Sequence, residues 1–168
     1  MSELSHVTVY TDGSAIGNPG PGGYGVVMLS GDHRRELSGG FRLTTNNRME
    51  ILACIVALEA LNRPCRITLH SDSRYVVDAV SKGWARKWRS NGWMRNKRER
   101  ALNPDLWERL LDLVAEHDVE FRWVPGHAGV AENERADRLA VTAAQGSSLP
   151  TDEAYEAENG RQSLGARR

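Results

Sequence analysis

Four carboxylate residues of this chain lie in local patterns that are typical of a divalent-cation site. Asp12 and Asp72 each follow a short, strand-like apolar run, whereas Glu50 and Asp137 lie in apolar helical segments. Carboxylates that lie close together without cationic partners raise the free energy of the folded protein unless a cation binds between them. Hard oxygen ligands of this kind suit Mg²⁺ or Mn²⁺, so the four residues are candidate ligands of such an ion.

Each carboxylate also has a structural interpretation. Asp12 precedes a glycine, a pair that starts many turns. Glu50 could complete a capping box with Asn47, and Asp72 could cap the helix that follows it. Glu50, however, shares its helical face with apolar residues, and Asp72 repeats the strand-end position of Asp12. The pattern of all four favours a metal site more than any one of them does.

A histidine accompanies the carboxylates. His127 stands in a short segment between two glycines, Gly126 and Gly129, which predicts a loop. A lone loop histidine is more often a surface residue than a catalytic one. Beside an acidic cluster, however, it becomes a candidate proton carrier or an aid to product release.

Charge is unevenly distributed, although the chain as a whole has a formal net charge of zero. Residues 82–100 contain eight basic residues and one acidic residue, interleaved with Trp84, Trp88 and Trp93. Such a segment could be a solvated amphipathic helix. The tryptophans and the acidic cluster elsewhere favour a contact with a polyanion such as nucleic acid.

The bulk composition is that of one globular domain. The chain has 168 residues, of which 40% are hydrophobic and 26% charged. Cys54 and Cys65 make neither a disulfide framework nor a CxxC motif. The sequence contains no evident signal peptide and no apolar run of membrane-spanning length, so we expect a cytoplasmic protein without a membrane partner.

Hydrophobic periodicity predicts an α/β fold. Strands are expected at 7–11, 24–29, 34–43, 66–71 and 119–124, with a loop over 12–23. Helices are expected at 47–62, 73–82, 104–117 and 132–144, and a helix plus a loop in the basic segment. This order predicts a mixed five-stranded sheet, three antiparallel strands and then two parallel ones, with helices on both faces. We expect a domain over 1–145 and a disordered tail over 146–168.

Five short motifs of the chain closely resemble the bacterial ribonuclease HI proteins of the type 1 ribonuclease H family. The motifs are Tyr-Thr-Asp-Gly-Ser at 10–14, Asn-Pro-Gly-Pro-Gly-Gly-Tyr-Gly at 18–25, Thr-Asn-Asn-Arg-Met-Glu at 45–50, Asp-Ser with Tyr-Val at 72–76, and Gly-His-Ala-Gly at 126–129. The resemblance spans about residues 7–144. It implies the ribonuclease H-like sheet.

The resemblance also implies an activity. It is an endonuclease that hydrolyses the RNA strand of RNA/DNA hybrids with two Mg²⁺ ions, Mn²⁺ being possible, and leaves 5′-phosphate and 3′-hydroxyl ends. It makes Asp12, Glu50, Asp72 and Asp137 the metal-binding carboxylates, with Asp12 bridging both ions. His127 becomes the histidine of the catalytic loop.

By the same resemblance, a groove and a basic protrusion bind the hybrid. Residues 82–107 correspond to the protrusion. The substrate-binding candidates are Asn18, Thr45, Asn46, Asn47, Ser73, Arg74, Trp84, Arg86, Lys87, Trp88, Arg89, Trp93 and Asn103. Thr45 and Asn103 would hold a phosphate of the DNA strand. Arg74 stands where a glutamine is frequent in the family, and a guanidinium cannot accept a hydrogen bond.

Two alternatives remain beside this interpretation. One is a nuclease of the same fold that cuts DNA, such as a junction resolvase or a transposase core. The other is a catalytically silent module that binds hybrids. The paired asparagines and the tryptophan-bearing protrusion oppose the first, and the complete set of four carboxylates opposes the second. We expect a monomer without an obligate protein partner.

Overall fold

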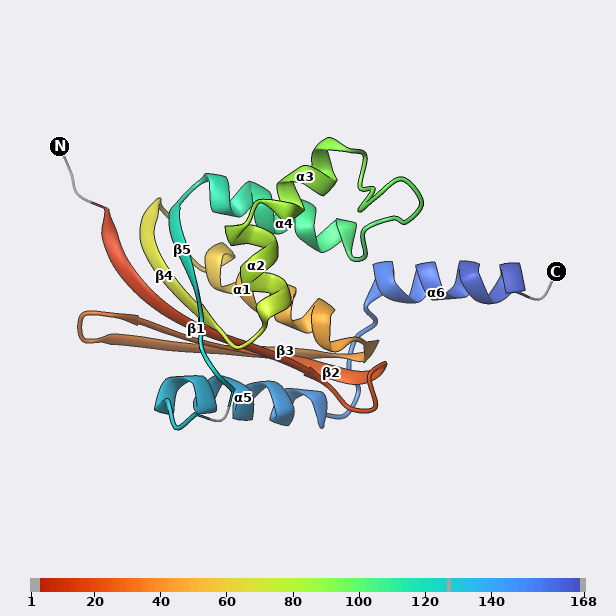
Figure 1. Ribbon diagram of the computed structural model, residues 1–168. Coiled ribbons are helices and arrows are strands. Elements are labelled where there is room, and N and C mark those ends of the chain that lie inside the picture. Colours follow the sequence, from red (N-terminus) through yellow and green to blue (C-terminus); the bar gives the residue numbers. More distant parts are fainter. Residues whose placement is uncertain (1–3, 127, 167–168) are drawn as a thin grey trace.

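A mixed five-stranded sheet forms the centre of the computed structural model, which describes residues 4–126 and 128–166 (Figure 1). The strands are β1 (Ser5–Ala15), β2 (Gly20–Ser30), β3 (His33–Thr44), β4 (Cys65–Ser71) and β5 (Asp118–Trp123). They lie in the order β3-β2-β1-β4-β5. β1, β2 and β3 are antiparallel neighbours, whereas β4 and β5 run parallel to β1. The predicted sheet is confirmed.

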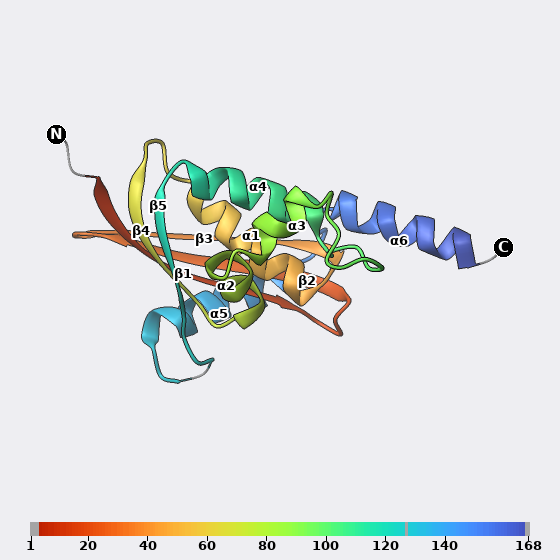
Figure 2. The same ribbon diagram turned by 45° about the horizontal axis from the view of Figure 1, so that its top comes forward.

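Helices cover both faces of the sheet. They are α1 (Asn46–Glu59), α2 (Arg74–Ser81), α3 (Trp84–Ser90), α4 (Pro104–Ala115), α5 (Ala131–Ala144) and α6 (Glu153–Ala166). Figures 1 and 2 show α1 to α4 on one face and α5 on the other, while α6 extends beyond the end of the sheet. Within the described residues, no helix combines the length and hydrophobicity required to cross a bilayer.

The main core lies between α1 and the sheet. Ile51, Ile55 and Leu58 of α1 are fully buried, as are Val9 of β1 and Leu69 of β4. Alternating burial along β4 reflects the two-residue period of a strand, whereas α1 is apolar on nearly all sides because α4 packs against it as well. Both cysteines are free and buried, as expected for Cys54.

The opposite face depends on glycines in β2. A Cβ atom added to Gly23 would lie 2.3 Å from the carbonyl oxygen of Ala140, and one added to Gly25 would lie 2.2 Å from that of Ala136. Both distances are far below van der Waals contact. The glycines therefore allow the backbone of α5 to lie directly on the sheet, which sets the position of every side chain that α5 carries.

The expected loop over 12–23 is wrong at both ends. β1 continues to Ala15 and β2 begins at Gly20, so the connection is only four residues long. The pairing continues from Asp12 opposite Gly25 to Ala15 opposite Gly22. Gly13 lies in β1, and Gly20, Pro21, Gly22 and Gly23 lie in β2, whereas Gly17 and Pro19 lie in the connection. Gly23 is required in β2 because α5 approaches there.

The segment after residue 145 also differs from the expectation of disorder. The backbone N–H of Arg42 donates a hydrogen bond of 2.9 Å to the carbonyl oxygen of Pro150. Asp152 is buried, with 7% of its surface exposed, and α6 begins at the next residue. The tail is thus attached to the end of β3. The boundary of the catalytic domain at residue 145 remains a prediction.

Candidate active site

The end of the β1–β4 ladder places two carboxylates side by side. The last parallel pair is Thr11 opposite Ser71, and the next residues are Asp12 and Asp72. β1 continues beyond this point alongside β2, while β4 ends, so the position beside Asp12 is open. Glu50, in α1, completes the group. One ligand atom from each of the three carboxylates lies within 4.8 Å of the others.

Gly13 explains how Glu50 reaches this group. A Cβ atom added to Gly13 would lie 2.3 Å from the backbone nitrogen of Glu50 and 2.3 Å from the carbonyl carbon of Met49. Only glycine allows the first turns of α1 to approach β1 so closely. The N–H of Gly13 also donates a hydrogen bond of 2.9 Å to Oδ1 of Asp12, which orients that carboxylate.

The start of α1 is fixed by Thr45 and not by the capping box considered above. The Thr45 side chain accepts a hydrogen bond from the backbone N–H of Arg48 at 3.2 Å, and the helix begins at Asn46. Ser73 caps α2 in the same way, accepting from Val76 at 3.2 Å. Glu50 and Asp72 are therefore not required as caps, which leaves their carboxylates for the cluster.

The electrostatics of the cluster are unfavourable without a cation. Burial, then the neighbouring Asp137 carboxyl and the charge of Asp72, raise the pKa of Asp12 to about 8. Burial and the charges of Asp12 and Asp72 raise the pKa of Glu50 well above its ordinary value of 4.5. Oε2 of Glu50 is buried and has no hydrogen-bond partner among the described residues. A divalent cation would satisfy this oxygen and reverse the repulsion, so these residues fit a metal.

Asp137 joins the cluster from the other side of the sheet. It lies on α5, and its carboxyl is close enough to Asp12 to raise the pKa of that residue. It is not one of the three tightly grouped carboxylates. The structure thus brings all four predicted residues together, three closely and Asp137 through its contact with Asp12. The seating of α5 on Gly23 and Gly25 determines its position.

The predicted loop histidine, His127, lies outside the described residues. The residue before it has a defined place, because a Cβ atom added to Gly126 would lie 3.2 Å from Oδ2 of Asp72. The N–H of Val124 extends the sheet by donating to the carbonyl oxygen of Ser71 at 2.9 Å. The segment that leads to residue 127 therefore passes directly beside the carboxylates.

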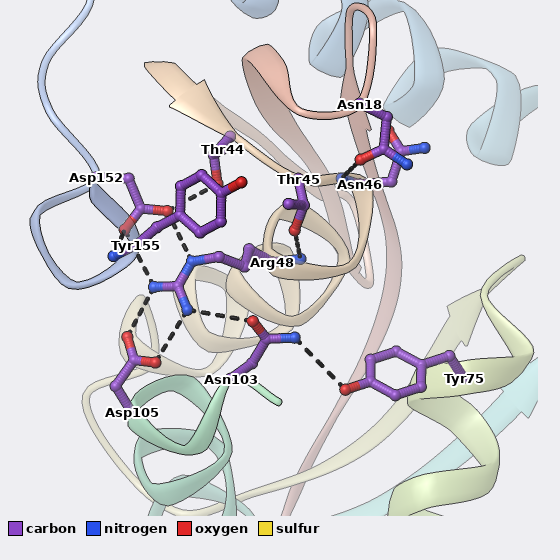
Figure 3. Close-up of polar contacts among 10 residues, drawn as sticks. All are labelled: Asn18, Thr44, Thr45, Asn46, Arg48, Tyr75, Asn103, Asp105, Asp152 and Tyr155. Carbon is purple, nitrogen blue, oxygen red and sulfur yellow. Dashed lines mark hydrogen bonds and ion pairs between the residues drawn. The ribbon is translucent and has the colours of Figure 1, made fainter. Parts of the chain in front are cut away.

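Two asparagines are hydrogen-bonded at the start of α1. The backbone N–H of Asn46 donates to Oδ1 of Asn18 at 3.0 Å (Figure 3). The N–H of Ala15 donates to Oδ1 of Asn46 at 2.5 Å. Both amide oxygens are therefore engaged within the protein. Their NH₂ groups can donate to a ligand.

Thr45 and Asn103 line one cavity of about 830 Å³, together with Asn18 and Asn47. Asn103 precedes α4 and has a left-handed backbone, with φ of 61°. Its side chain does not cap α4. Instead, Oδ1 accepts a hydrogen bond from Nη1 of Arg48 at 3.3 Å (Figure 3). The two residues expected to hold a DNA phosphate thus face a common space.

Arg74 has a partner that the sequence analysis missed. Its guanidinium lies over the ring of Trp123, 3.8 Å from the centroid. The indole N–H of Trp123 donates to the carbonyl oxygen of Asp72 at 3.1 Å. Trp123 therefore links the end of β5 to the cluster and holds Arg74 beside it. An aromatic residue at a strand end was the only sequence signal for this role.

The basic and aromatic side chains of residues 82–100 differ in exposure and in the partners that they contact. Arg86 and Lys87 of α3 are exposed, whereas Arg89 pairs with Asp112 at 2.9 Å, and Arg95 pairs with Glu99. The tryptophans of the segment also differ among themselves. Trp84 is 42% exposed, whereas Trp88 packs edge-on against buried Trp107 and Trp93 lies at the margin of the core. Part of the predicted nucleic-acid surface therefore supports the fold.

The sequence model of the RNase H family matches residues 4–145. The chain belongs to the ribonuclease H family. Among its relatives, a ribonuclease H of Desulforamulus reducens is 65% identical over 90% of this chain and 95% of its own length. A ribonuclease HI of Synechocystis sp. is 59% identical over 92% of this chain and 97% of its own length.

Solved structures agree with this assignment to ribonuclease H. LC9-RNase H1, a type 1 RNase H with the type 2 active-site motif, has a TM-score of 0.78 at 37% identity, over 99% of this chain and 86% of its own. LC11-RNase H1 in complex with an RNA/DNA hybrid has a TM-score of 0.63 at 26% identity, over 82% and 95%. The family is metal-dependent, and this ribonuclease H has an acidic group that could hold a metal.

Proposed function

We propose that the carboxylate cluster hydrolyses the RNA strand of RNA/DNA hybrids with divalent cations, of which Mg²⁺ is the natural choice. One observation carries the proposal. Asp12, Glu50 and Asp72 converge within 4.8 Å, and Oε2 of Glu50 is buried without a partner among the described residues. In a ribonuclease H, such an acidic group is where the phosphodiester must be placed. LC11-RNase H1, a structural neighbour, has been solved with a hybrid bound.

Each carboxylate has a role in the proposed mechanism. Asp12, Glu50 and Asp72 would hold the metal, and Asp137 would complete the site from α5. Bound divalent ions would supply positive charge for activation of the attacking water and for stabilisation of the leaving 3′ oxygen. Gly13 keeps Glu50 against β1, and its N–H orients the carboxylate of Asp12. The products carry 5′-phosphate and 3′-hydroxyl ends. We assign His127 to proton transfer or product release.

Substrate selection would depend on groups around the cluster. The NH₂ groups of Asn18 and Asn46 are suited to donate to ribose hydroxyls and to acceptors in the minor groove. Asn47 lines the same cavity as Asn18, and Ser73 follows Asp72 at the start of α2. Arg74, which lies over Trp123, would bring a positive charge to the substrate. Thr45 and Asn103 would donate to a phosphate of the DNA strand from the cavity that they line.

The basic protrusion would bind the hybrid farther from the cut. Arg86 and Lys87 supply exposed charge, and Trp84 supplies an exposed ring. Trp88, Trp93 and Arg89 would contribute mainly by supporting α3. The proposal extends to a monomer that acts in the cytoplasm. Sedimentation of the purified protein and fractionation of cells test those two points.

The proposed function is tested by cleavage of four matched labelled substrates: RNA/DNA, RNA/RNA, DNA/DNA and single-stranded RNA. Each is incubated with Mg²⁺, with Mn²⁺ and with EDTA. We expect cutting of the RNA strand in the hybrid alone, stopped by EDTA. Cutting of DNA/DNA would instead indicate a resolvase-like or transposase-like nuclease. Tight hybrid binding without any cutting would indicate a silent binding module.

A further inference from the structure

We propose that Asp152, in the segment that follows the family domain, is a positioning residue for hybrid binding. It acts through Arg48 on Asn103, which faces the cavity assigned above to the DNA strand. This inference rests on the proposed function, because it names what keeps that subsite in shape. The family model ends at residue 145, so the assignment adds a C-terminal element to the binding machinery.

The first step is the saturation of Arg48. Its guanidinium is buried, and each of its five N–H groups has an acceptor. Nε donates to Asp152 at 2.8 Å, and Nη2 donates to Asp152 at 3.0 Å and to Asp105 at 2.7 Å. Nη1 donates to Asp105 at 2.9 Å and to Asn103 at 3.3 Å. Arg48 is thus fully engaged within the protein, so it acts as a brace and not as a phosphate ligand.

The second step is the anchoring of Asp152. Its carboxylate accepts a hydrogen bond from Oγ1 of buried Thr44 at 2.7 Å, besides those from Arg48. The segment around it is attached to β3 by the hydrogen bond from Arg42 to Pro150 and by an ion pair between Arg42 and Glu156 at 2.8 Å. Asp152 therefore connects the tail to the end of β3 and to the first turn of α1 (Figure 3).

The third step is the effect on Asn103. Arg48 can only donate, so it fixes Oδ1 of Asn103 towards itself and turns the NH₂ group away. That NH₂ group lies 3.5 Å from the hydroxyl of Tyr75 (Figure 3). Asn103 also has a left-handed backbone and makes no side-chain cap to α4, so its contacts with Arg48 and Tyr75 orient its amide.

The tail also contributes to the shape of the subsite. Ala154 and Tyr155 line the same 830 Å³ cavity as Thr45 and Asn103. The ring of Tyr155 lies 6.0 Å from the guanidinium carbon of Arg48 and covers it from one side. The C-terminal segment is therefore both a wall of the cavity and the source of the charge that keeps Arg48 in place.

The test compares Asp152→Asn with the wild type in two assays. The dissociation constant of a labelled hybrid is measured by anisotropy in EDTA, and kcat is measured at saturating hybrid with Mg²⁺. Asparagine has an NH₂ group in place of one carboxylate oxygen. This NH₂ group would face the N–H donors of Arg48, so Arg48 would no longer be held in place. We expect the hybrid to bind about three- to tenfold more weakly while kcat is unchanged. The matched control, Glu153→Gln, removes an exposed carboxylate of the same helix without touching Arg48 or Arg42 and should change neither value.

A double-mutant cycle separates positioning from general destabilisation. In an Asn103→Ala background, Asp152→Asn should no longer weaken binding, because the residue that it positions is gone. Thr44→Val, which removes only one donor to Asp152, provides a milder variant if Asp152→Asn does not fold. It should weaken binding by about twofold, and again only when Asn103 is present.

Unchanged affinity in both Asp152→Asn and Thr44→Val, or equal losses with and without Asn103, would overturn the proposal. A wild-type protein that binds hybrids in EDTA but never cuts them would instead contradict the proposed function. The double-mutant cycle, which measures hybrid affinity in EDTA, could still be interpreted in that case.

Discussion

The carboxylate cluster and the basic segment use charge in opposite ways. Asp12 and Glu50 are buried carboxyl groups, and burial and the neighbouring carboxylates raise their pKa values well above the ordinary range. In residues 82–100, the charges are exposed, and several have local partners, such as Arg89 with Asp112 and Arg95 with Glu99. Ionisation of the carboxylate cluster is therefore unfavourable until a cation binds, whereas the charges of the basic segment require no bound ion.

The two regions should therefore be sensitive to different kinds of substitution. The cluster depends on backbone approaches that only glycine permits, at Gly13 below α1 and at Gly25 below α5. Small shifts there separate the ligands. The basic segment depends on the sum of exposed side chains, so single changes should have graded effects.

Asp12→Asn should have the largest effect on activity. The substitution removes the charge of the carboxylate that contacts the other acidic residues and keeps its size. We expect kcat for hybrid cleavage to fall about a thousandfold, equivalent to about 4 kcal/mol of barrier, with hybrid affinity retained. Single-turnover cleavage and anisotropy measure the two quantities. Near-normal cleavage by this variant would rule out the proposed ligand set.

Gly25→Ala tests the seating of α5. The added methyl group would lie 2.2 Å from the carbonyl oxygen of Ala136, so α5 and with it Asp137 must move. We expect a loss of about 2 kcal/mol in the free energy of unfolding and a clear fall in kcat. Chemical denaturation and cleavage assays provide the measurements. Ser38→Ala, the partner of Gly25 on β3, is the control and should lie within about 0.5 kcal/mol of wild type.

Neutralising single charges of the basic segment should have the smallest effect, which is on hybrid binding. The size of the effect should depend on whether the charge is paired with a carboxylate. Arg86→Gln and Lys87→Gln remove exposed charges, whereas Arg89→Gln removes a charge that is paired with Asp112. We expect each of the first two to reduce the salt dependence of hybrid binding by about one phosphate contact, and Arg89→Gln by less. Equal slopes for all three variants would contradict the distinction between free and paired charges.

Much of the fold could be predicted because hydrophobic periodicity reports directly on burial. The alternation in β1 and β4 and the apolar run of α1 gave the correct element types and sheet. The segment 12–23 could not be predicted in this way. Gly23 is required by the approach of α5, a contact more than a hundred residues away in sequence, and Gly13 by the approach of α1, whereas the same glycines locally indicate a loop.

Some residues of the candidate site could also be predicted from the sequence, whereas others could not. Asp12 and Asp72 could be identified because each follows an apolar run in the sequence, although β1 itself continues to Ala15. Arg48 and Asp152 were missed, because their ion pair joins residues 104 positions apart and the tail composition suggested disorder. Trp123 was missed because its importance lies in a hydrogen bond to the backbone of Asp72 and a contact with Arg74. Such roles exist only once distant segments are packed together.

The central claim is that the buried carboxylates repel one another until a divalent cation binds. The pKa of Asp12 is about 8 in the folded protein and ordinarily 3.8, so between these pH values the folded state binds more protons than the unfolded state. The free energy of unfolding of the metal-free protein should therefore decrease as the pH rises from about 4 to about 8. Mg²⁺ should restore it at the upper end.

The most direct test is the free energy of unfolding of wild type and Asp12→Asn at pH 8, each in EDTA and in Mg²⁺. We predict that Asp12→Asn is the more stable protein in EDTA, and that Mg²⁺ stabilises the wild type much more than the variant. Equal stabilities in EDTA, together with equal responses to Mg²⁺, would contradict the account.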